Sequence, residues 1–477
     1  MTEEYDDKVF KDISFINNIK TMAVVGPSEK RHFFFLRNHQ ENFHGKIYAV
    51  HPKIKQIPGF DDGTQGKIYP SVREIPEQVD FVFIAVPPSV VIDVIDDCVE
   101  NGVRLASIFT AEFSDAGTEE GRELERKLIT HAKNKIRILG PNGMGLYYPK
   151  LGIAWRPKFP NESGNIGFIA QSGGICNIAI YTTKQHDIKF SKVFSFGNGA
   201  DLDFVDLLHF LSEDSETEII LGYIEGISKE RGKALKRALD LNEKPLIVLK
   251  GGKSEKGSQA AKTHTATLSG EKKIWEALFE QYGVIHVDTM EELLYAARII
   301  DCYGLFNIQN LAILSNSGGY GVILVDLLEE AGFDIPSFSY EVQQKLDKRF
   351  FTLGTSSSNP LDISAQIYAS EAVYEIIDIA LSDDNIDALI MDLPPWYFNM
   401  EYHINKDETF EPNMIKALRL GKKHDKPLIP IIQRANCQED RERVTKKLEQ
   451  QKVPVFANPL EFIPILQKIS KNKAKEL

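Results

Sequence analysis

Residues 21–26, TMAVVG, form a short apolar run that ends at a glycine, and this pattern decides the fold of the first part of the chain. Runs rich in Val, Ile and Phe are typical of strands that are buried on both faces of a parallel sheet. Four more runs follow: KIYAVHP (46–52), VDFVFIAVPP (79–88), RLASIFTAEF (104–113) and IRILGPN (136–142). Helical candidates at 89–101 and 116–134 lie between them, so the alternation predicts a doubly wound α/β domain over residues 1–145.

The stretch LYYPKLGIAWRPKFPNESGN (146–165) interrupts this rhythm, and its prolines and glycines predict a linker or crossing segment. A second α/β series begins at NIGFIAQSGG, and a third begins at NLAILSNSGG. The sequence therefore predicts three domains, over residues 1–145, 146–305 and 306–477. This number agrees with about 150 residues per domain in a chain of 477 residues.

The second and third series resemble each other and indicate a duplicated unit. Four pairs of segments match in the same order: GFIAQSGGICNIAI with LAILSNSGGYGVILV, NGADLDFVD with SNPLDIS, KPLIVLK with KPLIPII, and VIHVDTMEELL with VPVFANPLEFI. After its KPLIVLK strand the first copy carries GGKSEKGSQAAKTHTATLSG, whereas the second carries QRANCQEDRER, which has no histidine. Features kept in both copies serve the shared scaffold, so the unshared His264 is the better candidate for chemistry.

His264 lies among Gly, Ser, Thr and Ala residues, which leave an imidazole accessible. Its ordinary pKa is about 6.5, so an imidazole nitrogen can accept a phosphoryl group at neutral pH. The alternative is a histidine in a surface loop without such a role. Ser172, Gly173 and Gly174 end a strand and open a helix, whose amides attract phosphate. The alternative for that turn is a need for small residues in packing.

Glu225 ends the predicted strand IILGYIE. A residue in this position lies at the carboxyl edge of a parallel sheet, where ligands bind. A carboxylate there can accept a hydrogen bond from the second nitrogen of a phosphorylated histidine and orient the ring. A surface glutamate is the alternative interpretation.

Several residues of the first domain follow its predicted strands at the same edge of the sheet. Gly26 and Ser28 belong to the first strand-to-helix turn, and Lys30 and Arg31, which follow it, can neutralise a phosphate. Residues after the later strands jointly outline a crevice: Lys53, Val86, Pro87 and Asn142. The turn lacks a full GxGxxG, which argues against a standard NAD site.

The composition limits the classes of function. With 56 Lys and Arg against 68 Asp and Glu, the net charge is −12. An acidic surface disfavours broad binding to nucleic acid or to anionic membranes. The four cysteines lie far apart and form no CxxC, which suits a reducing compartment. We see neither a signal peptide nor an apolar run of about 20 residues, and expect a cytoplasmic protein.

Taken together, these motifs resemble those of the α chain of the NDP-forming acyl-CoA synthetases, the acetate–CoA ligase (ADP-forming) group of the succinyl-CoA synthetase superfamily. The strongest match is SQAAKTHTATLSG around His264, which is similar to the family's SHTGxLAG. VVGPS, AVHPK, GPNGMG, IAQSGG, FGNGADLD and YIEGI add to it. The resemblance covers nearly the whole chain. It implies a Rossmann-like CoA-binding domain followed by two flavodoxin-like parallel-sheet domains.

The resemblance also implies an activity. Acyl-CoA, ADP and phosphate would be interconverted with a carboxylic acid, CoA and ATP, through an acyl phosphate and a phosphohistidine. His264 would carry the phosphoryl group, Glu225 would orient it, and Ser172, Gly173 and Gly174 would hold phosphate. The CoA site would be lined by Gly26, Ser28, Lys53, Val86, Pro87 and Asn142. No metal ligands are expected in this chain.

The same resemblance implies a partner. The three predicted domains use up the chain, so ATP or ADP with Mg would bind a separate ATP-grasp β subunit. We expect an α2β2 assembly, with a small carboxylic acid and its acyl-CoA as substrates and no nucleic acid or membrane partner. The acyl group, and the choice between ADP and GDP, stay open.

The sequence departs from the family pattern in several places. Gly143 stands where the family has Cys in GPNC, and Gly199 replaces the Glu of GNEAD. Ala266 replaces the Gly of HTG, and Glu112 stands where the family has Gly in SAGF and could alter an acyl pocket. These departures favour one alternative, a catalytically inactive CoA- or acyl-CoA-binding regulator. A nucleotide-dependent dehydrogenase and the protein-acetylating branch of the family are two further alternatives.

Overall fold

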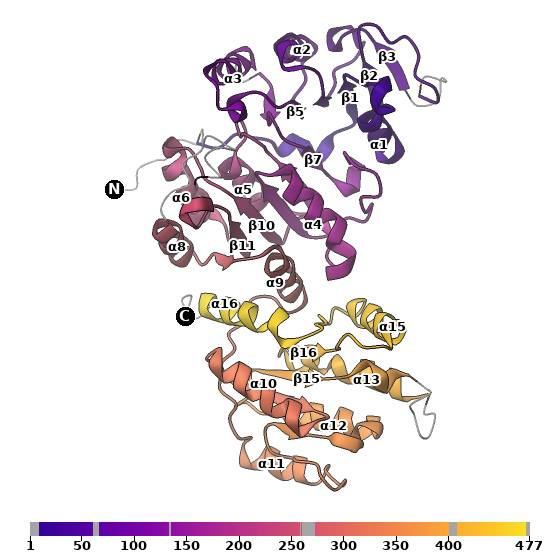
Figure 1. The fold of residues 1–477 in the computed structure, drawn as a ribbon, viewed down its shortest axis with the longest axis vertical. Helices are drawn as coiled ribbons and strands as arrows, with labels where there is room; N and C mark the ends of the chain where they lie inside the picture. Colours follow the sequence, from indigo (N-terminus) through magenta and orange to yellow (C-terminus); the bar gives the residue numbers. More distant parts are fainter. Residues whose placement is uncertain are drawn as a thin grey trace. The chain divides into compact units, whose positions relative to one another are not determined.

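The computed structural model describes residues 9–60, 66–132, 135–257, 259, 272–399 and 408–473. Contacts divide the chain into two compact units, Met1–Asp288 and Thr289–Leu477. Figure 1 draws the first in indigo to dark red and the second mainly in orange and yellow. Over the described ranges, no helix has the length and apolar character needed to cross a bilayer.

The first sheet of the N-terminal unit is parallel, and its strand order is β3-β2-β1-β4-β5-β6. Its strands are β1 (Thr21–Val25), β2 (Lys46–Val50), β3 (Gly66–Tyr69), β4 (Phe81–Ile84), β5 (Leu105–Ile108) and β6 (Arg137–Leu139). The helices in the same part are α1 (Phe34–Asn42), α2 (Pro88–Asn101) and α3 (Glu119–Ala132). Strands β1, β4 and β5 are buried along their whole length, which explains their apolar runs. The predicted doubly wound arrangement is confirmed.

Strand β3 is absent from the sequence prediction. It lies beside β2 at the edge of the sheet, and its residues are exposed or half-buried. Hydrophobic patterning reports burial, so a partly exposed edge strand leaves a weak signal in the sequence. The five predicted runs correspond to β1, β2, β4, β5 and β6.

The second sheet of this unit has the order β12-β11-β10-β8-β9-β7. Its strands are β7 (Gly145–Tyr147), β8 (Ile166–Ala170), β9 (Phe190–Ser195), β10 (Ile219–Ile224), β11 (Leu246–Lys250) and β12 (Ile285–Val287). All pairs are parallel except β7 with β9. The helices are α4 (Gly173–His186), α5 (Phe204–Glu213), α6 (Gly232–Leu241) and α8 (Lys272–Gln281).

Residues 146–165, predicted to be a linker or crossing segment, are an integral part of this second domain. They complete β7, and Tyr148 and Trp155 are fully buried. The Trp155 ring packs edge-on against Phe159, and its Nε1 donates to Asn177 Oδ1 of α4 at 2.9 Å. The prolines and glycines led to the prediction of a linker or crossing segment, because they carry no information about burial.

The C-terminal unit has a parallel sheet with the order β14-β13-β15-β16. Its strands are β13 (Leu311–Ser315), β14 (Leu361–Asp362), β15 (Ala388–Asp392) and β16 (Leu428–Ile431). Its helices are α9 (Met290–Tyr303), α10 (Gly318–Glu330), α11 (Tyr340–Asp347), α12 (Ser370–Leu381), α13 (Phe410–Leu418), α14 (Leu420–His424), α15 (Gln438–Glu449) and α16 (Ile463–Lys473). Helix α9 packs here rather than with the second sheet, since Tyr303 Oη donates to Leu428 O at 2.7 Å. The domain boundary after residue 305 stays a prediction.

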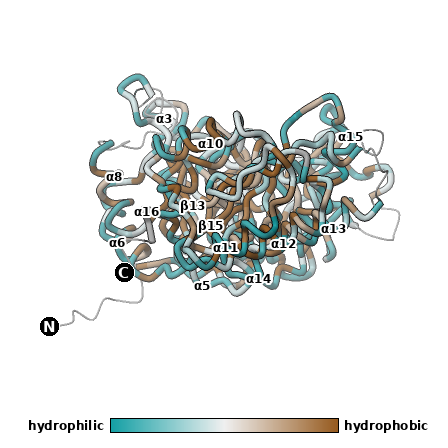
Figure 2. The backbone as a smooth tube through the Cα atoms, turned by 90° about the horizontal axis from the view of Figure 1, so that it is seen from below, coloured by the Kyte–Doolittle hydropathy of each residue, from teal (hydrophilic) through white to brown (hydrophobic). Residues whose placement is uncertain are grey.

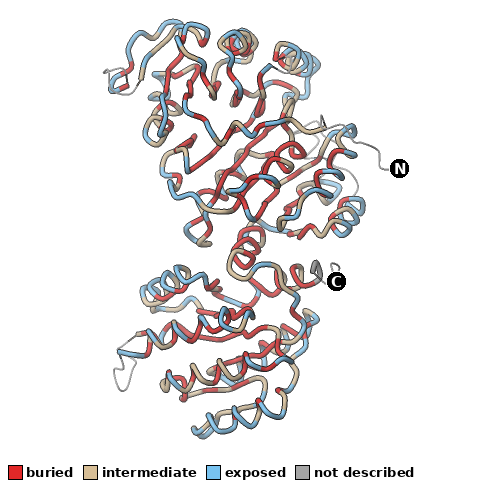
Figure 3. Tube along the Cα trace, turned by 180° about the vertical axis from the view of Figure 1, so that it is seen from behind, coloured by how far each residue is buried: buried red, intermediate tan, exposed pale blue. Residues whose placement is uncertain are grey.

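Burial follows the sheets in both units. Figure 3 shows the strands mostly in red, with exposed residues along the outer faces of the helices. In Figure 2, β13 and β15 lie in the brown, hydrophobic interior of their unit. A buried hydrophobic cluster of that unit joins these strands to α12 and α13. Each sheet is therefore held by its own apolar core.

Three of the four matches between the copies fall on equivalent elements. The first pair of segments forms β8 with α4 in one copy and β13 with α10 in the other, and the third pair forms β11 and β16. The fourth pair runs beside β11 in one copy and beside β16 in the other. The match of NGADLDFVD with SNPLDIS is wrong. Residues 198–206 follow β9, whereas residues 361–362 form β14 itself, the neighbour of β13.

Candidate functional site

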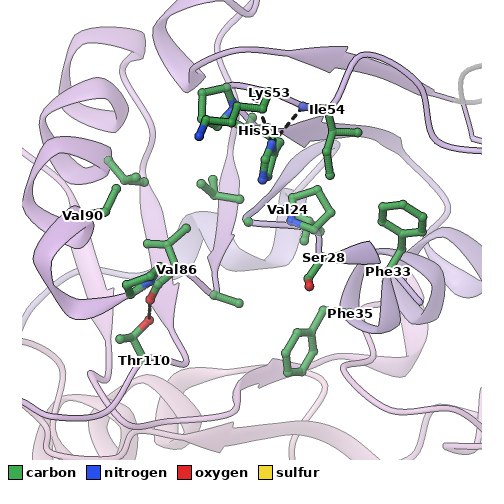
Figure 4. Close-up of a pocket in the computed structure, with 18 of the residues that line it drawn as sticks. Val24, Ser28, Phe33, Phe35, His51, Lys53, Ile54, Val86, Val90 and Thr110 are labelled. Atoms are coloured by element: carbon green, nitrogen blue, oxygen red, sulfur yellow. Dashed lines mark hydrogen bonds between the residues drawn. The ribbon is translucent and has the colours of Figure 1, made fainter. Parts of the chain in front are cut away.

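A large cavity opens at the carboxyl ends of β1 and β4, where the strand order of the first sheet reverses. Its volume is about 1350 Å³, and ligands of doubly wound folds bind at this point. Figure 4 shows Phe33 and Phe35 on one side of it and Val90 on the other. The structure brings all six residues predicted for the cofactor site into its lining: Gly26, Ser28, Lys53, Val86, Pro87 and Asn142.

Gly26 fits the close approach that a phosphate-bearing ligand needs at the first turn. Its φ is +86°, and a Cβ would lie 2.6 Å from Ala85 O and 2.7 Å from Val86 Cγ1. A side chain here would be strained and would collide with the end of β4. At Gly26 the backbone of the turn therefore lines the cavity without a side chain to shield it.

The cavity carries a set of cationic side chains. Lys30, Arg31, Lys53 and Lys55 all line it, and within the described residues none of them forms an ion pair. The carboxylates Glu29, Asp93 and Asp97 also line it, and Asp97 is paired with Arg73. Unpaired Lys and Arg in a protein of net charge −12 favour an anionic ligand.

His51 lines the large cavity, although the sequence analysis did not select it as a site residue. Its Nδ1 accepts hydrogen bonds from the backbone N of Lys53 at 3.1 Å and of Ile54 at 3.0 Å (Figure 4). Burial lowers the pKa of His51, although Glu29 partly opposes this. The neutral ring therefore shapes the turn that carries Lys53. Its place directly after β2 was the signal available in the sequence.

A second, smaller cavity of about 380 Å³ adjoins the first. The two share Phe109 and Asn142 in their linings. The smaller one is lined further by Gly143, Met144, Arg156, Gln171, Ser172, Gly173, Gly174, Asn177, Gly197, Asn198 and Glu225. It thus brings together the predicted phosphate turn and the predicted orienting carboxylate, which lie 51 residues or more apart in the sequence.

The phosphate turn has the geometry expected of a helix N-terminus. Ser172 is the N-cap of α4, and its Oγ accepts from Ile175 N at 3.4 Å. Gly173 and Gly174 are the first two residues of α4, and both line the cavity. A helix of this length offers its first amides and its positive end to an anion.

Glu225 follows β10 directly, as predicted. Its Oε1 accepts from Tyr223 Oη at 3.1 Å, and its backbone N donates to Gln171 Oε1 at 3.0 Å. Its Oε2 is buried and has no hydrogen-bond partner among the described residues. A buried carboxylate oxygen without a donor is costly, so this atom is available to an N–H that enters the cavity.

Lys250, the last residue of β11, links Glu225 to the start of residues 251–270, the segment that contains His264. Its Nζ donates to Glu225 O at 2.8 Å and also to Gly251 O. Burial lowers the pKa of Lys250 to about 8. His264 itself lies outside the described residues, so its position stays a prediction.

The C-terminal copy lacks the open carboxylate. Asp392 ends β15 as Glu225 follows β10, but both of its oxygens are engaged. Gln433 Nε2 donates to Oδ1 at 3.2 Å and Asn316 Nδ2 donates to Oδ2 at 3.1 Å. The contrast agrees with chemistry in the first copy and scaffold in the second.

The departures from the family pattern have local causes. A Cβ at Gly143 would lie 2.6 Å from Ser195 O, so this chain has no space for a larger residue there. Gly199 has a φ of +67°, which favours glycine. Glu112 also has a positive φ, +73°, but it is exposed and lines neither cavity. The expectation that Glu112 shapes an acyl pocket is therefore not supported, and Ala266 lies outside the described residues.

Comparison with protein families matches two domains. A CoA binding domain matches residues 20–149, and a succinyl-CoA ligase like flavodoxin domain matches residues 163–300. These ranges contain the first sheet with its large cavity and most of the second sheet with the smaller one.

Curated relatives and a solved structure agree with these matches. The chain is 35% identical to the ADP-forming acetate–CoA ligase II subunit alpha of Pyrococcus furiosus, over 79% of the chain and 81% of the relative. It is 36% identical to the ADP-forming acetate–CoA ligase I of Archaeoglobus fulgidus, over 79% of the chain, but spans only 54% of that relative. A dinucleotide-forming acetyl-CoA synthetase of Ca. Korarchaeum cryptofilum, solved with phosphate and ADP, superposes with a TM-score of 0.81 at 28% identity, covering 97% of both chains.

Proposed function

The chain belongs to the family of ADP-forming acetate–CoA ligases, and we propose that it is the α subunit of such an enzyme, with CoA in its large cavity and His264 as phosphoryl carrier. The family resemblance found in the sequence motifs is thereby confirmed. The observation that carries the proposal is the shared wall of the two cavities, formed by Phe109 and Asn142. We therefore place one end of a ligand of the large cavity next to the smaller one, which is lined by the anion site and the open carboxylate.

In the proposed reaction, acyl-CoA, ADP and phosphate are interconverted with a carboxylic acid, CoA and ATP. CoA supplies the thiol that carries the acyl group. On this chain, Gly26 has no side chain and lets the ligand approach the backbone closely. Lys53 and the neighbouring cations neutralise its phosphate groups. Ser28, Val86, Pro87 and Asn142 line the rest of that path.

The phosphoryl group is proposed to move to His264 in the smaller cavity. The amides of Gly173 and Gly174 at the N-terminus of α4, capped by Ser172, stabilise its charge. Glu225 Oε2 accepts the N–H of the second imidazole nitrogen, which fixes the tautomer and directs the other nitrogen at the phosphorus. A carrier histidine divides one transfer between distant substrates into two local ones.

The second half of the reaction is assigned to a partner. ATP or ADP with Mg would bind a separate ATP-grasp β subunit, and an α2β2 assembly is proposed. No nucleic acid or membrane partner is invoked. The described cysteines are free thiols, which suits the proposed cytoplasmic location.

Calorimetry with CoA tests the proposal on the full chain. Lys53→Ala removes a cation from the cavity and is expected to weaken CoA binding by about tenfold or more, the usual effect of a lost charge-assisted contact. Lys46→Ala is the matched control, because Lys46 lies on the same sheet but pairs with Glu77 outside the cavity. Tight NAD binding without CoA binding would instead favour the dehydrogenase alternative.

A further inference from the structure

The side wall of the smaller cavity contains an arginine that the proposed reaction does not use. Arg156 lines the cavity, and its Nε is buried without a hydrogen-bond partner. Across the described residues, its guanidinium makes no ion pair. Arg presents donors in a planar fork that matches a carboxylate, and an unsatisfied buried N–H is costly. The guanidinium of Arg156 is therefore available to bind an anionic ligand in this cavity.

The backbone on both sides of Arg156 is fixed to helix α4. Trp155 Nε1 donates to Asn177 Oδ1 at 2.9 Å, and Tyr181 Oη donates to Pro157 O at 3.1 Å. Asn177 is one helical turn beyond Gly173, or about 6 Å along the axis. Arg156 thus enters the cavity from an element distinct from the phosphate turn, and its chain is anchored farther along α4.

Asn177 adds a second donor on the same wall. Its Oδ1 is engaged by Trp155, so its Nδ2 is the polar atom left for the cavity, and it has no partner within the described part of the chain. Phe109 and Met144 contribute apolar lining to the same cavity. The cavity therefore combines two sets of donors suited to anions with apolar side chains.

Resting on the proposed function, we propose that Arg156 and Asn177 bind a second anionic group at the far end of the acyl substrate, and that the acid is a short dicarboxylate. The reacting carboxyl group and phosphate occupy the N-terminus of α4. The methylene carbons lie against Phe109 and Met144, and the distal carboxylate accepts hydrogen bonds from Arg156. A volume of about 380 Å³ lies at the low end of the range for small-molecule pockets.

A matched pair of acids tests the assignment. Succinate and butyrate have the same number of carbons, and they differ in whether the far end is a carboxylate or a methyl group. Both are titrated calorimetrically into the full chain saturated with CoA. Wild type should bind succinate about tenfold or more tightly than butyrate, because a charge-assisted contact is lost with the methyl end.

Variants of Arg156 then identify the source of the preference. Arg156→Met should remove it and Arg156→Lys should restore part of it. Arg122→Met, which removes an exposed cation on α3, should leave it unchanged. CoA affinity, measured on each variant, reports whether the N-terminal unit is still folded.

Three outcomes overturn the assignment. Equal binding of succinate and butyrate by wild type would show that no distal carboxylate site exists. Failure of both acids to bind a chain that binds CoA would show the same. A loss of inorganic phosphate binding in Arg156→Met, with the preference between acids intact, makes Arg156 a phosphate ligand instead. Failure of wild type to bind CoA at all contradicts the proposed function rather than this inference.

Discussion

Replacement of Asp392 by asparagine is expected to stabilise the C-terminal unit, and more so as the pH rises. Burial raises the pKa of Asp392 to about 7, against the opposing hydrogen bonds from Ser315, Gln433 and Asn316. The folded state therefore binds more protons than the unfolded state between the ordinary pKa of about 3.9 and pH 7. In that window, the free energy of unfolding falls as the pH rises.

The size of the effect follows from the width of the window. Each pH unit in it changes the free energy of unfolding by about 1.4 kcal/mol. Asparagine has nearly the same shape and does not titrate, and the energy of reorienting its neighbours does not depend on pH. Between pH 5 and pH 8 the advantage of Asp392→Asn over wild type should therefore widen by about 2–3 kcal/mol, two pH units of the window.

Urea unfolding followed by tryptophan fluorescence measures this difference. Trp396 is the one tryptophan of residues 289–477, so a variant that retains only Trp396 reports on the C-terminal unit. Asp384→Asn is the control, since Asp384 is an exposed carboxylate of the same unit. A gap between Asp392→Asn and wild type that stays constant from pH 5 to pH 8, or that narrows, would refute the reasoning.

Two further substitutions examine the N-terminal unit. Gly26→Ala should destabilise it by at least about 1–2 kcal/mol and weaken CoA binding, since the turn is left-handed and a Cβ would meet a backbone oxygen at 2.6 Å. Thermal unfolding measures the stability of both this variant and Gly117→Ala. Gly117 has a φ of +72° and no atom within 4 Å of an added Cβ, so Gly117→Ala reports the backbone strain alone. Glu225→Gln should lower phosphorylation of His264 by about tenfold or more, because the charged acceptor is lost, while size and CoA binding are kept. Mass spectrometry should find this loss absent in Glu230→Gln, an exposed control, and equal labelling of both variants would argue against the orienting role.

The strands could be predicted because burial leaves its mark on local sequence. Runs such as TMAVVG and VDFVFIAVPP are apolar since their strands are buried on both faces, and they fall on β1 and β4. Strand β3 was missed because an exposed edge needs no such run. The role of residues 146–165 depends on aromatic rings meeting α4, which no local pattern encodes.

The candidate site was predictable to the extent that it follows the sheet. Residues that end parallel strands or open the next helix converge at one edge, so Gly26, Asn142, Ser172 and Glu225 could be singled out one at a time. Arg156 could not, because it lies in an irregular segment and reaches the cavity only through the packing of Trp155 on α4. The sequence motif around His264 predicts the chemistry, and the open oxygen of Glu225 agrees with it.

Phosphorylation of His264 tests the central claim most directly. The full chain is mixed with the proposed ATP-grasp β subunit, ATP and Mg²⁺, and the phosphate is mapped by mass spectrometry at neutral pH. The account predicts an acid-labile, base-stable phosphate on His264, which His264→Ala abolishes while CoA binding in the other domain is unchanged. A phosphate that persists in His264→Ala, one mapped to a serine or threonine of residues 258–270, or a chain that binds CoA and takes up no phosphate would contradict it.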